Sequence, residues 1–219
     1  YEMSASLVGS EMCIRDRNSA EYIKCKFIDF MLSKNYELII GNELMYGIKR
    51  KLVDLVVLKN NKIFAVEIKS NSDNLNRLKE QIEEYKKVFN YVLVVTTEKF
   101  KNRILDTVSS DIGVYIIEAD LSLHKIRSPR IQNDRNKIEI LYSINAKFLS
   151  KIGHYSLQKY NADEIRLLYA NKRISYIQEI LLTYLLEKYK DRFNLFMRER
   201  GIQTHIEDLE ILSSSFQIE

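Results

Sequence analysis

Hydrophobic positions along the chain follow two periods, one typical of helices and one typical of strands. Apolar residues spaced three and four apart predict helices that begin near Asn18, run from Asp73 to about Phe89, and run from Phe100 to Val108. Extended apolar runs predict strands over five stretches: about 37–48, 52–58, 63–69, 91–97 and 114–118. The expected order is therefore helix, three strands, helix, strand, helix, strand.

A two-residue turn, Asn60-Asn61, separates the second and third predicted strands, and this predicts a tight β-hairpin. In such a hairpin, residues whose numbers sum to 121 face each other, so Asp54 is expected directly opposite Glu67. Side chains alternate along a strand, which places Lys69 on the same face. The order of elements suits an antiparallel meander with a crossover to further strands, in an α/β fold with a three-layer α/β/α core and a mixed central sheet.

The composition changes after Asp120. A polar stretch that holds the only proline, Pro129, is expected to be a linker, and helical spacing follows it. Candidate helices lie at about 137–152, 162–171, 174–200 and 204–212, with Gly153 and Gly201 as stops. We therefore expect three parts in chain order: a tail over residues 1–17, an α/β domain over 18–120 and an all-helical region over 121–219.

The first 17 residues show no sustained period and lack the parts of a signal peptide. Residues 6–17 resemble translated sequencing-adapter read-through, and the alternative is a disordered tail. Both interpretations exclude this segment from the fold.

Asp54 is the lone polar residue of an otherwise apolar predicted strand, where an acid is unfavourable without a partner. Two carboxylates facing each other across a hairpin repel, and a divalent cation is the simplest means of neutralising them. Lys69 brings a third charged group to the same face. The alternative is an exposed sheet face that carries mixed charges without a function.

These residues resemble the motif of the PD-(D/E)xK nuclease superfamily, with Asp54 as the first acid and Glu67-Ile68-Lys69 as the second half. Gln81 and Tyr85 on the following predicted helix match the QxxxY pattern of the RecB-like branch. Val53 stands where the family name has proline. Further resemblances, which extend the match over roughly residues 37–97, are Glu43 as an additional acid, Asp73, and Arg77-Leu78 as in small stand-alone bacterial and phage members.

The resemblance implies a restriction-endonuclease-like core and metal-dependent hydrolysis of phosphodiester bonds, with DNA as the expected substrate. Asp54, Glu67 and the backbone carbonyl of Ile68 would hold Mg²⁺ or Mn²⁺, and Lys69 would stabilise charge on the reacting phosphate. The remaining residues of the expected site are Glu43 as a catalytic acid, with Glu21 as its alternative, and Gln81, Tyr85 and Arg50 as support.

The composition argues against several classes of protein. A net charge of +4 is mild for a nucleic-acid-binding protein, and the two cysteines are too few for a disulfide framework, so a cytoplasmic protein is expected. His and Cys residues lack zinc-ligand spacing, and no glycine-rich nucleotide loop occurs. The longest apolar stretch, 180–186, is far shorter than the roughly 20 residues that span a bilayer.

Two alternatives stay open at this point. One is a non-catalytic nucleic-acid-binding module that keeps its acids for folding. The other is a component of a phage, mobile-element or defence system that cuts only with a partner protein. The helical region would bind DNA, gate the acidic face or mediate homodimer formation, and the sequence does not choose among these roles.

Overall fold

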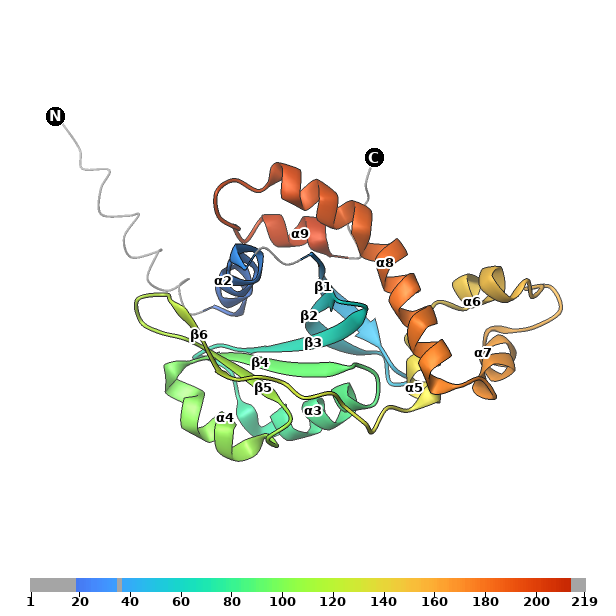
Figure 1. Cartoon of the computed structure of the whole chain (residues 1–219), viewed down its shortest axis with the longest axis horizontal. Coiled ribbons are helices and arrows are strands. Elements are labelled where there is room, and N and C mark those ends of the chain that lie inside the picture. Colours follow the sequence, from blue (N-terminus) through green and yellow to red (C-terminus); the bar gives the residue numbers. More distant parts are fainter. Residues whose placement is uncertain (1–18, 35–36, 214–219) are drawn as a thin grey trace.

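The computed structural model describes residues 19–34 and 37–213, and within them a six-stranded mixed sheet carries helices on both faces (Figure 1). In chain order the elements are α2 (Ala20–Ser33), β1 (Leu38–Tyr46), β2 (Lys51–Lys59), β3 (Lys62–Lys69), the 3₁₀ turn η1 (Leu75–Arg77), α3 (Leu78–Lys86), β4 (Tyr91–Thr97), the 3₁₀ turn η2 (Glu98–Phe100), α4 (Lys101–Thr107), β5 (Gly113–Ile117), β6 (Leu123–Arg127), α5 (Lys137–Tyr142), α6 (Ala146–Gly153), α7 (Ala162–Ala170), α8 (Ile174–Glu199) and α9 (Asp208–Leu212).

The strands lie side by side in their sequence order, from β1 to β6. β1, β2 and β3 pair antiparallel, β3, β4 and β5 pair parallel, and β6 returns antiparallel to β5. The parallel pairs follow from the crossovers through α3 and α4, since parallel neighbours cannot be joined by a tight turn. The predicted α/β class and mixed sheet are therefore confirmed.

Two apolar clusters lie on opposite faces of the sheet. The first packs α3 and α4 under the sheet and continues beside it into α5, α6, α7 and the first half of α8, with Tyr85, Phe89 and Ile104 among its buried members (Figure 1). The second packs α2, α9 and the end of α8 on the other face, with Phe27 and Phe196 fully buried. Three layers result, with the sheet in the middle.

Helix α8 contributes to both clusters, because its first half joins the first cluster and its last turns join the second. It passes close to the edge strand β1 at Gly41. A Cβ atom there would lie 2.5 Å from the Tyr189 ring, so only glycine allows this approach. The helices beyond residue 136 thus pack in the same two apolar clusters as the sheet.

Several predicted boundaries hold and several do not. β4 and α8 occupy nearly the stretches expected, and α6 ends at Gly153, although His154 takes the left-handed conformation with φ of 54°. β6 lies where a polar linker was predicted. The stretch 137–152 is broken into α5 and α6, because the Asn145 side chain caps a new helix by accepting a bond from the backbone N of Lys147. The predicted helix 204–212 is shortened to α9, over Asp208–Leu212.

The start of two helices also differs from expectation. The expected cap Asn18 and the tail over 1–17 lie outside the described residues, and Ser19 caps α2 by accepting a bond from Tyr22 N. Asp73 does not cap a helix, because its carboxylate instead accepts hydrogen bonds from Ser70 N at 2.7 Å and Ser70 Oγ at 2.6 Å. The segment after it begins as η1, which Asn74 caps.

The hairpin between β2 and β3 is the one expected. Asn60 and Asn61 have φ of 51° and 57°, as a type I′ turn requires, and the ladder runs from Lys59 opposite Lys62 to Leu55 opposite Val66. All these pairs follow the predicted register.

Replacing Asn61 by alanine should lower the free energy of unfolding by about 1 kcal/mol, because alanine tolerates the left-handed conformation less well than asparagine. Asn61→Gly should leave it unchanged or raise it. Urea denaturation of both variants measures the difference. Equal stability of the alanine variant and the parent would contradict the turn assignment.

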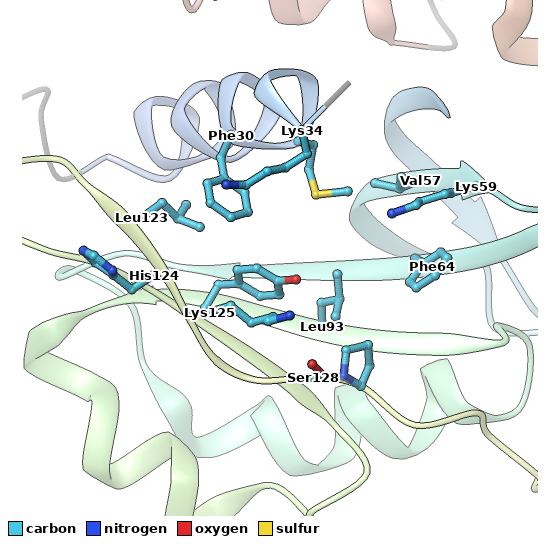
Figure 2. A pocket seen from close by; sticks show the side chains of 13 residues that line it. Phe30, Lys34, Val57, Lys59, Phe64, Leu93, Leu123, His124, Lys125 and Ser128 are labelled. Carbon is cyan, nitrogen blue, oxygen red and sulfur yellow. The ribbon is translucent and has the colours of Figure 1, made fainter. Parts of the chain in front are cut away.

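One end of the second face is hollow. A cavity of about 500 Å³ lies between the last turns of α2 and the β5–β6 hairpin (Figure 2). In the described part of the chain, no helix is long and apolar enough to cross a membrane.

Candidate active site

The two acids of the expected site lie where β2 and β3 separate. Their ladder ends at Leu55 opposite Val66, one step before the pair Asp54–Glu67. Asp54 Oδ2 instead accepts a hydrogen bond from the backbone N of Ile68 at 2.8 Å, so a side chain replaces the next ladder bond. The predicted register is confirmed as far as Leu55 opposite Val66, and Asp54 and Glu67 lie one step beyond the last ladder pair.

Glu67 is bound to Lys69, two residues further along β3. Lys69 Nζ lies 2.6 Å from Glu67 Oε1, and both residues are buried, with exposed fractions of 7% and 2%. Lys69 Nζ also donates a hydrogen bond to Gln81 Oε1 at 3.1 Å. The ammonium group is therefore held by one residue of its own strand and one of α3.

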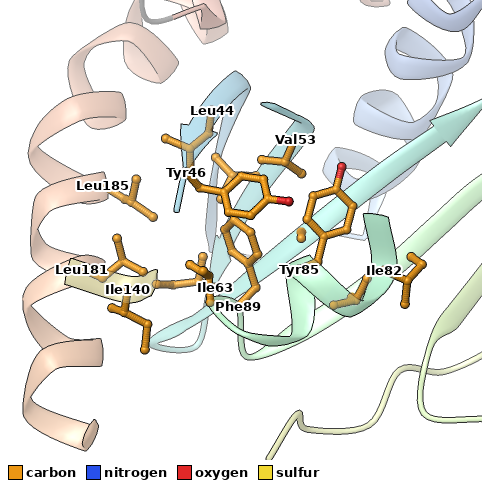
Figure 3. Packing of buried hydrophobic residues seen from close by; sticks show 14 of the residues in the cluster. Leu44, Tyr46, Val53, Ile63, Ile82, Tyr85, Phe89, Ile140, Leu181 and Leu185 are labelled. Atoms are coloured by element: carbon orange, nitrogen blue, oxygen red, sulfur yellow. The ribbon is translucent and has the colours of Figure 1, made fainter. Parts of the chain in front are cut away.

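Tyr85 completes this network from α3, one turn after Gln81. Its hydroxyl donates a hydrogen bond to Glu67 Oε2. The ring is fully buried and packs against Tyr46 and Phe89 in the first cluster (Figure 3). Gln81 and Tyr85 thus both contact charged residues of the expected site, Lys69 and Glu67.

Burial shifts the proton affinities of the site. Loss of hydration, followed by the charge of Glu67, raises the pKa of Asp54 to about 6, against the opposing influence of the Ile68 amide and of Lys24 and Lys69. Burial and the same Glu67 charge raise the pKa of Tyr85 well above its usual range, so its hydroxyl stays a hydrogen-bond donor. The charge of Glu67 therefore disfavours ionisation of Asp54.

Glu43 lies beside Asp54 on the neighbouring strand, because the flanking pairs are Asn42 opposite Leu55 and Leu44 opposite Val53. Its φ of 56° is rare for a residue other than glycine and interrupts the regular backbone of β1. Lys24 of α2 reaches this point from the other face, with Nζ 3.7 Å from Glu43 Oε1 and 3.1 Å from Asn42 Oδ1.

Lys24 is a site residue that sequence reasoning missed. It is 5% exposed, and its charge acts on Asp54. The signal was present in the sequence, since Lys24 precedes Phe27 by three residues and Ile28 by four and so lies within the buried stripe of α2. A lysine in that position is unusual without an anionic or polar partner.

The other expected residues lie at the surface or in turns. Glu21 is exposed in the first turn of α2, and Arg50 is exposed in the turn between β1 and β2. Asp73 lies in the turn after β3, bound to Ser70. Of the two alternatives for an additional acid, Glu43 is the one that the structure places next to Asp54.

The donors available to a metal ion are few. Within residues 19–34 and 37–213, no group of three or more His, Cys, Asp or Glu side chains is arranged to hold a metal ion. Any cation bound between Asp54 and Glu67 would have these two carboxylates as its side-chain ligands and would complete its shell with backbone carbonyls and water.

Comparisons with known proteins give the family. A solved structure of a Silicibacter pomeroyi protein of unknown function aligns with a TM-score of 0.40 and 16% identity, over 66% of this chain and 86% of that one. Protein cII of Enterobacteria phage P4 is 26% identical over 204 residues, which are 88% of this chain and 77% of that protein. The expectation of a phage-related protein is thereby confirmed. The family model for bacteriophage P4 protein cII matches residues 15–213, and the chain therefore belongs to the bacteriophage P4 protein cII family.

Proposed function

We propose that this chain is a metal-dependent nuclease of the PD-(D/E)xK type, which hydrolyses phosphodiester bonds in DNA. The observation that carries the proposal is the meeting of Asp54, Glu67 and Lys69 where the β2–β3 ladder ends. The contacts of Gln81 and Tyr85 with Lys69 and Glu67 support it, because the QxxxY pattern assigns these residues to the same site. A restriction-endonuclease-like core is the fold this proposal requires, and the mixed sheet between two helical layers is compatible with it.

The donor set suits magnesium or manganese. Mg²⁺ prefers oxygen ligands, keeps several waters and is commonly held by one or two carboxylates, which Asp54 and Glu67 supply. Burial, and then the charge of Glu67, raises the pKa of Asp54, and a bound cation would offset both effects. When bound, such an ion would polarise the phosphate and lower the pKa of a bound water.

The side chains around the acids would hold the site in one geometry and supply positive charge. The hydrogen bonds from Gln81 and Tyr85 would hold the Lys69–Glu67 pair in one geometry, and preorganised charge is the largest contributor in many enzymes. Lys69 would direct its positive charge at the phosphate oxygens as they gain negative charge. Lys24 would balance the acids from the α2 side.

A different observation favours a second function. Both oxygens of Glu67 already accept interactions from Lys69 and Tyr85, so the acid is compensated within the protein. This closed arrangement favours a module that uses these residues for folding and binds nucleic acid without cutting it, or one that needs a partner protein to open the site.

A cleavage assay separates these functions. The full chain is incubated with linear, circular and single-stranded DNA in Mg²⁺ or Mn²⁺, beside Glu67→Gln and the matched exposed variant Glu98→Gln. We expect metal-dependent cutting that falls at least about a hundredfold in Glu67→Gln and persists in Glu98→Gln. Cleavage by Glu67→Gln at the parental rate would exclude Glu67 from the mechanism.

Failure of the parent chain to cut has two distinguishable meanings. Calorimetry with Mg²⁺ and Mn²⁺ then shows whether a cation binds. Binding that Glu67→Gln weakens would favour the partner-dependent enzyme, whereas absence of binding would favour the non-catalytic module.

A further inference from the structure

The hairpin of β1 and β2 ends in a tip, residues 45–52, that exposes large apolar side chains. Met45 and Leu52 lie directly opposite each other in the ladder and are 44% and 49% exposed. Ile48, in the turn between them, is 48% exposed. Single exposed apolar side chains are normal on a protein surface, but a group of them at one place marks a surface that contacts something else.

The same hairpin tip carries positive charge. Lys49 and Arg50 directly follow Ile48, and both are exposed. The next residue, Lys51, is instead paired with α3, where its Nζ lies 2.8 Å from Glu80 Oε1. The tip therefore presents two cationic side chains to solvent next to the apolar ones. A partner that combines negative charge with apolar surface complements this pattern.

Helix α5 holds the hairpin tip in one conformation. The backbone N of Gly47 donates a hydrogen bond to Ser143 Oγ at 2.9 Å, and the backbone N of Ile48 donates one to Glu139 Oε2, also at 2.9 Å. Gly47 takes the left-handed conformation, with φ of 68°, and a Cβ atom there would lie 2.7 Å from the same Glu139 oxygen. Ile48 is thus exposed on a backbone that the rest of the fold fixes.

The hairpin tip adjoins the acids of the proposed active site. Leu52 precedes Asp54 by two residues, about 7 Å along a strand. The hydroxyl of Tyr85, which binds Glu67, also lies 3.4 Å from the backbone O of Leu52. A molecule that contacts the tip therefore lies beside both acids.

We propose that the hairpin tip is a wedge that holds the two strands of DNA apart beside the acids, and that the substrate class is DNA with a junction between duplex and single strand. This inference rests on the proposed nuclease function. In an intact duplex the bases are stacked inside, so the exposed apolar side chains would stay uncovered. Where the strands separate, apolar base faces lie next to phosphates, and Ile, Leu and Met are side chains that proteins insert between base steps. Ile48 and Leu52 would contact the bases, whereas Lys49 and Arg50 would bind the phosphates.

The test uses the full chain and forked DNA that carries 2-aminopurine in the last base pair before the fork, with Ca²⁺ in place of Mg²⁺. Unstacking of 2-aminopurine raises its fluorescence, so the signal measures strand opening without cleavage. We expect the parent chain to raise the fluorescence at least about twofold. By fluorescence anisotropy it should bind the fork at least about fivefold more tightly than a blunt duplex of the same length.

Two variants separate the apolar contact from the phosphate contact. Ile48→Ala should reduce the fluorescence increase at least about threefold, because it removes the inserted side chain. Lys49→Gln should weaken the binding of forked and blunt DNA alike, by about two- to threefold, since a phosphate contact does not depend on strand separation. The matched control is Leu167→Ala, at a 62% exposed position of α7, which should behave as the parent does. Melting temperatures show that each variant is folded.

Three results would overturn the proposal. One is a fluorescence signal that the parent does not raise. Another is an equal increase in the parent and in Ile48→Ala. The third is a parent dimer that Ile48→Ala converts to a monomer in analytical ultracentrifugation, which would assign the tip to contact between two copies of the chain.

The wedge and the nuclease function fail separately. Opening of the fork by a chain that cuts no DNA would support the wedge and count against the nuclease function. Metal-dependent cutting of blunt and forked DNA at the same rate, without opening of the fork, would support the nuclease function and overturn the wedge.

Discussion

Lys69→Ala should abolish the proposed nuclease activity and lower the free energy of unfolding at the same time. Lys69 Nζ lies 2.6 Å from Glu67 Oε1 in a buried position, so its removal leaves the Glu67 carboxylate without its cation. Breaking a buried ion pair from one side costs about 3 kcal/mol or more. In the proposed mechanism Lys69 directs its charge at the reacting phosphate, so its loss should lower the cleavage rate about a thousandfold.

A double variant separates the two effects. In Lys69→Ala combined with Glu67→Gln, neither charge is left buried alone, so we expect about 2 kcal/mol of the lost stability to return. Cleavage should not return. Urea denaturation measures the stability of the single and double variants, and the cleavage assay measures their rates. A single variant that retains full activity would remove Lys69 from the mechanism.

The contacts of Gln81 and Tyr85 with β3 and the position of Asp54 follow from local rules that a sequence can show. An Asn60-Asn61 turn sets a hairpin register by its backbone conformation, and that register alone brings Asp54 next to Glu67. The spacing of Gln81 and Tyr85 puts both on one side of α3 without reference to the rest of the chain.

Other parts depend on contacts between distant segments. Lys24 of α2 donates a hydrogen bond to Asn42 in the middle of β1, and Asn42 also donates a hydrogen bond to Leu209 O of α9, 167 residues away. No local pattern reports such a contact. β6 was missed for a related reason, because an edge strand with mostly exposed side chains lacks the apolar run that marks a buried strand.

The packing of α8 also could not be predicted from local sequence patterns. Its apolar residues predict a helix, but they do not show that one helix packs with both faces of the sheet. Gly41 is the residue of β1 that permits this packing, because the Tyr189 ring fills the space a side chain would need. The pairing of a small residue with a large one is visible only when both elements are in place.

Asp54→Asn should stabilise the metal-free protein at pH 8 and leave it nearly unchanged at pH 4. Asp54 has a pKa of about 6 in the folded protein, mainly because burial and then the Glu67 charge disfavour its ionised form. The ordinary pKa of an aspartate is 3.8, so between about pH 4 and 6 the folded state binds more protons than the unfolded state, and stability falls as the pH rises. Above pH 6 the destabilisation is complete, and asparagine should relieve about 2 kcal/mol of it.

Denaturation with urea in EDTA at both pH values measures this difference, and a repeat at pH 8 with Mg²⁺ tests the cation site. The metal should raise the stability of the parent, because it binds only the folded state, and should have a smaller effect on the variant. Asparagine keeps an oxygen that can accept the hydrogen bond from Ile68, so loss of that bond does not confound the comparison. A variant less stable than the parent at pH 8 would mean that Asp54 serves the fold as a charged partner of Lys24 or Lys69, and that its repulsion from Glu67 is already compensated within the protein.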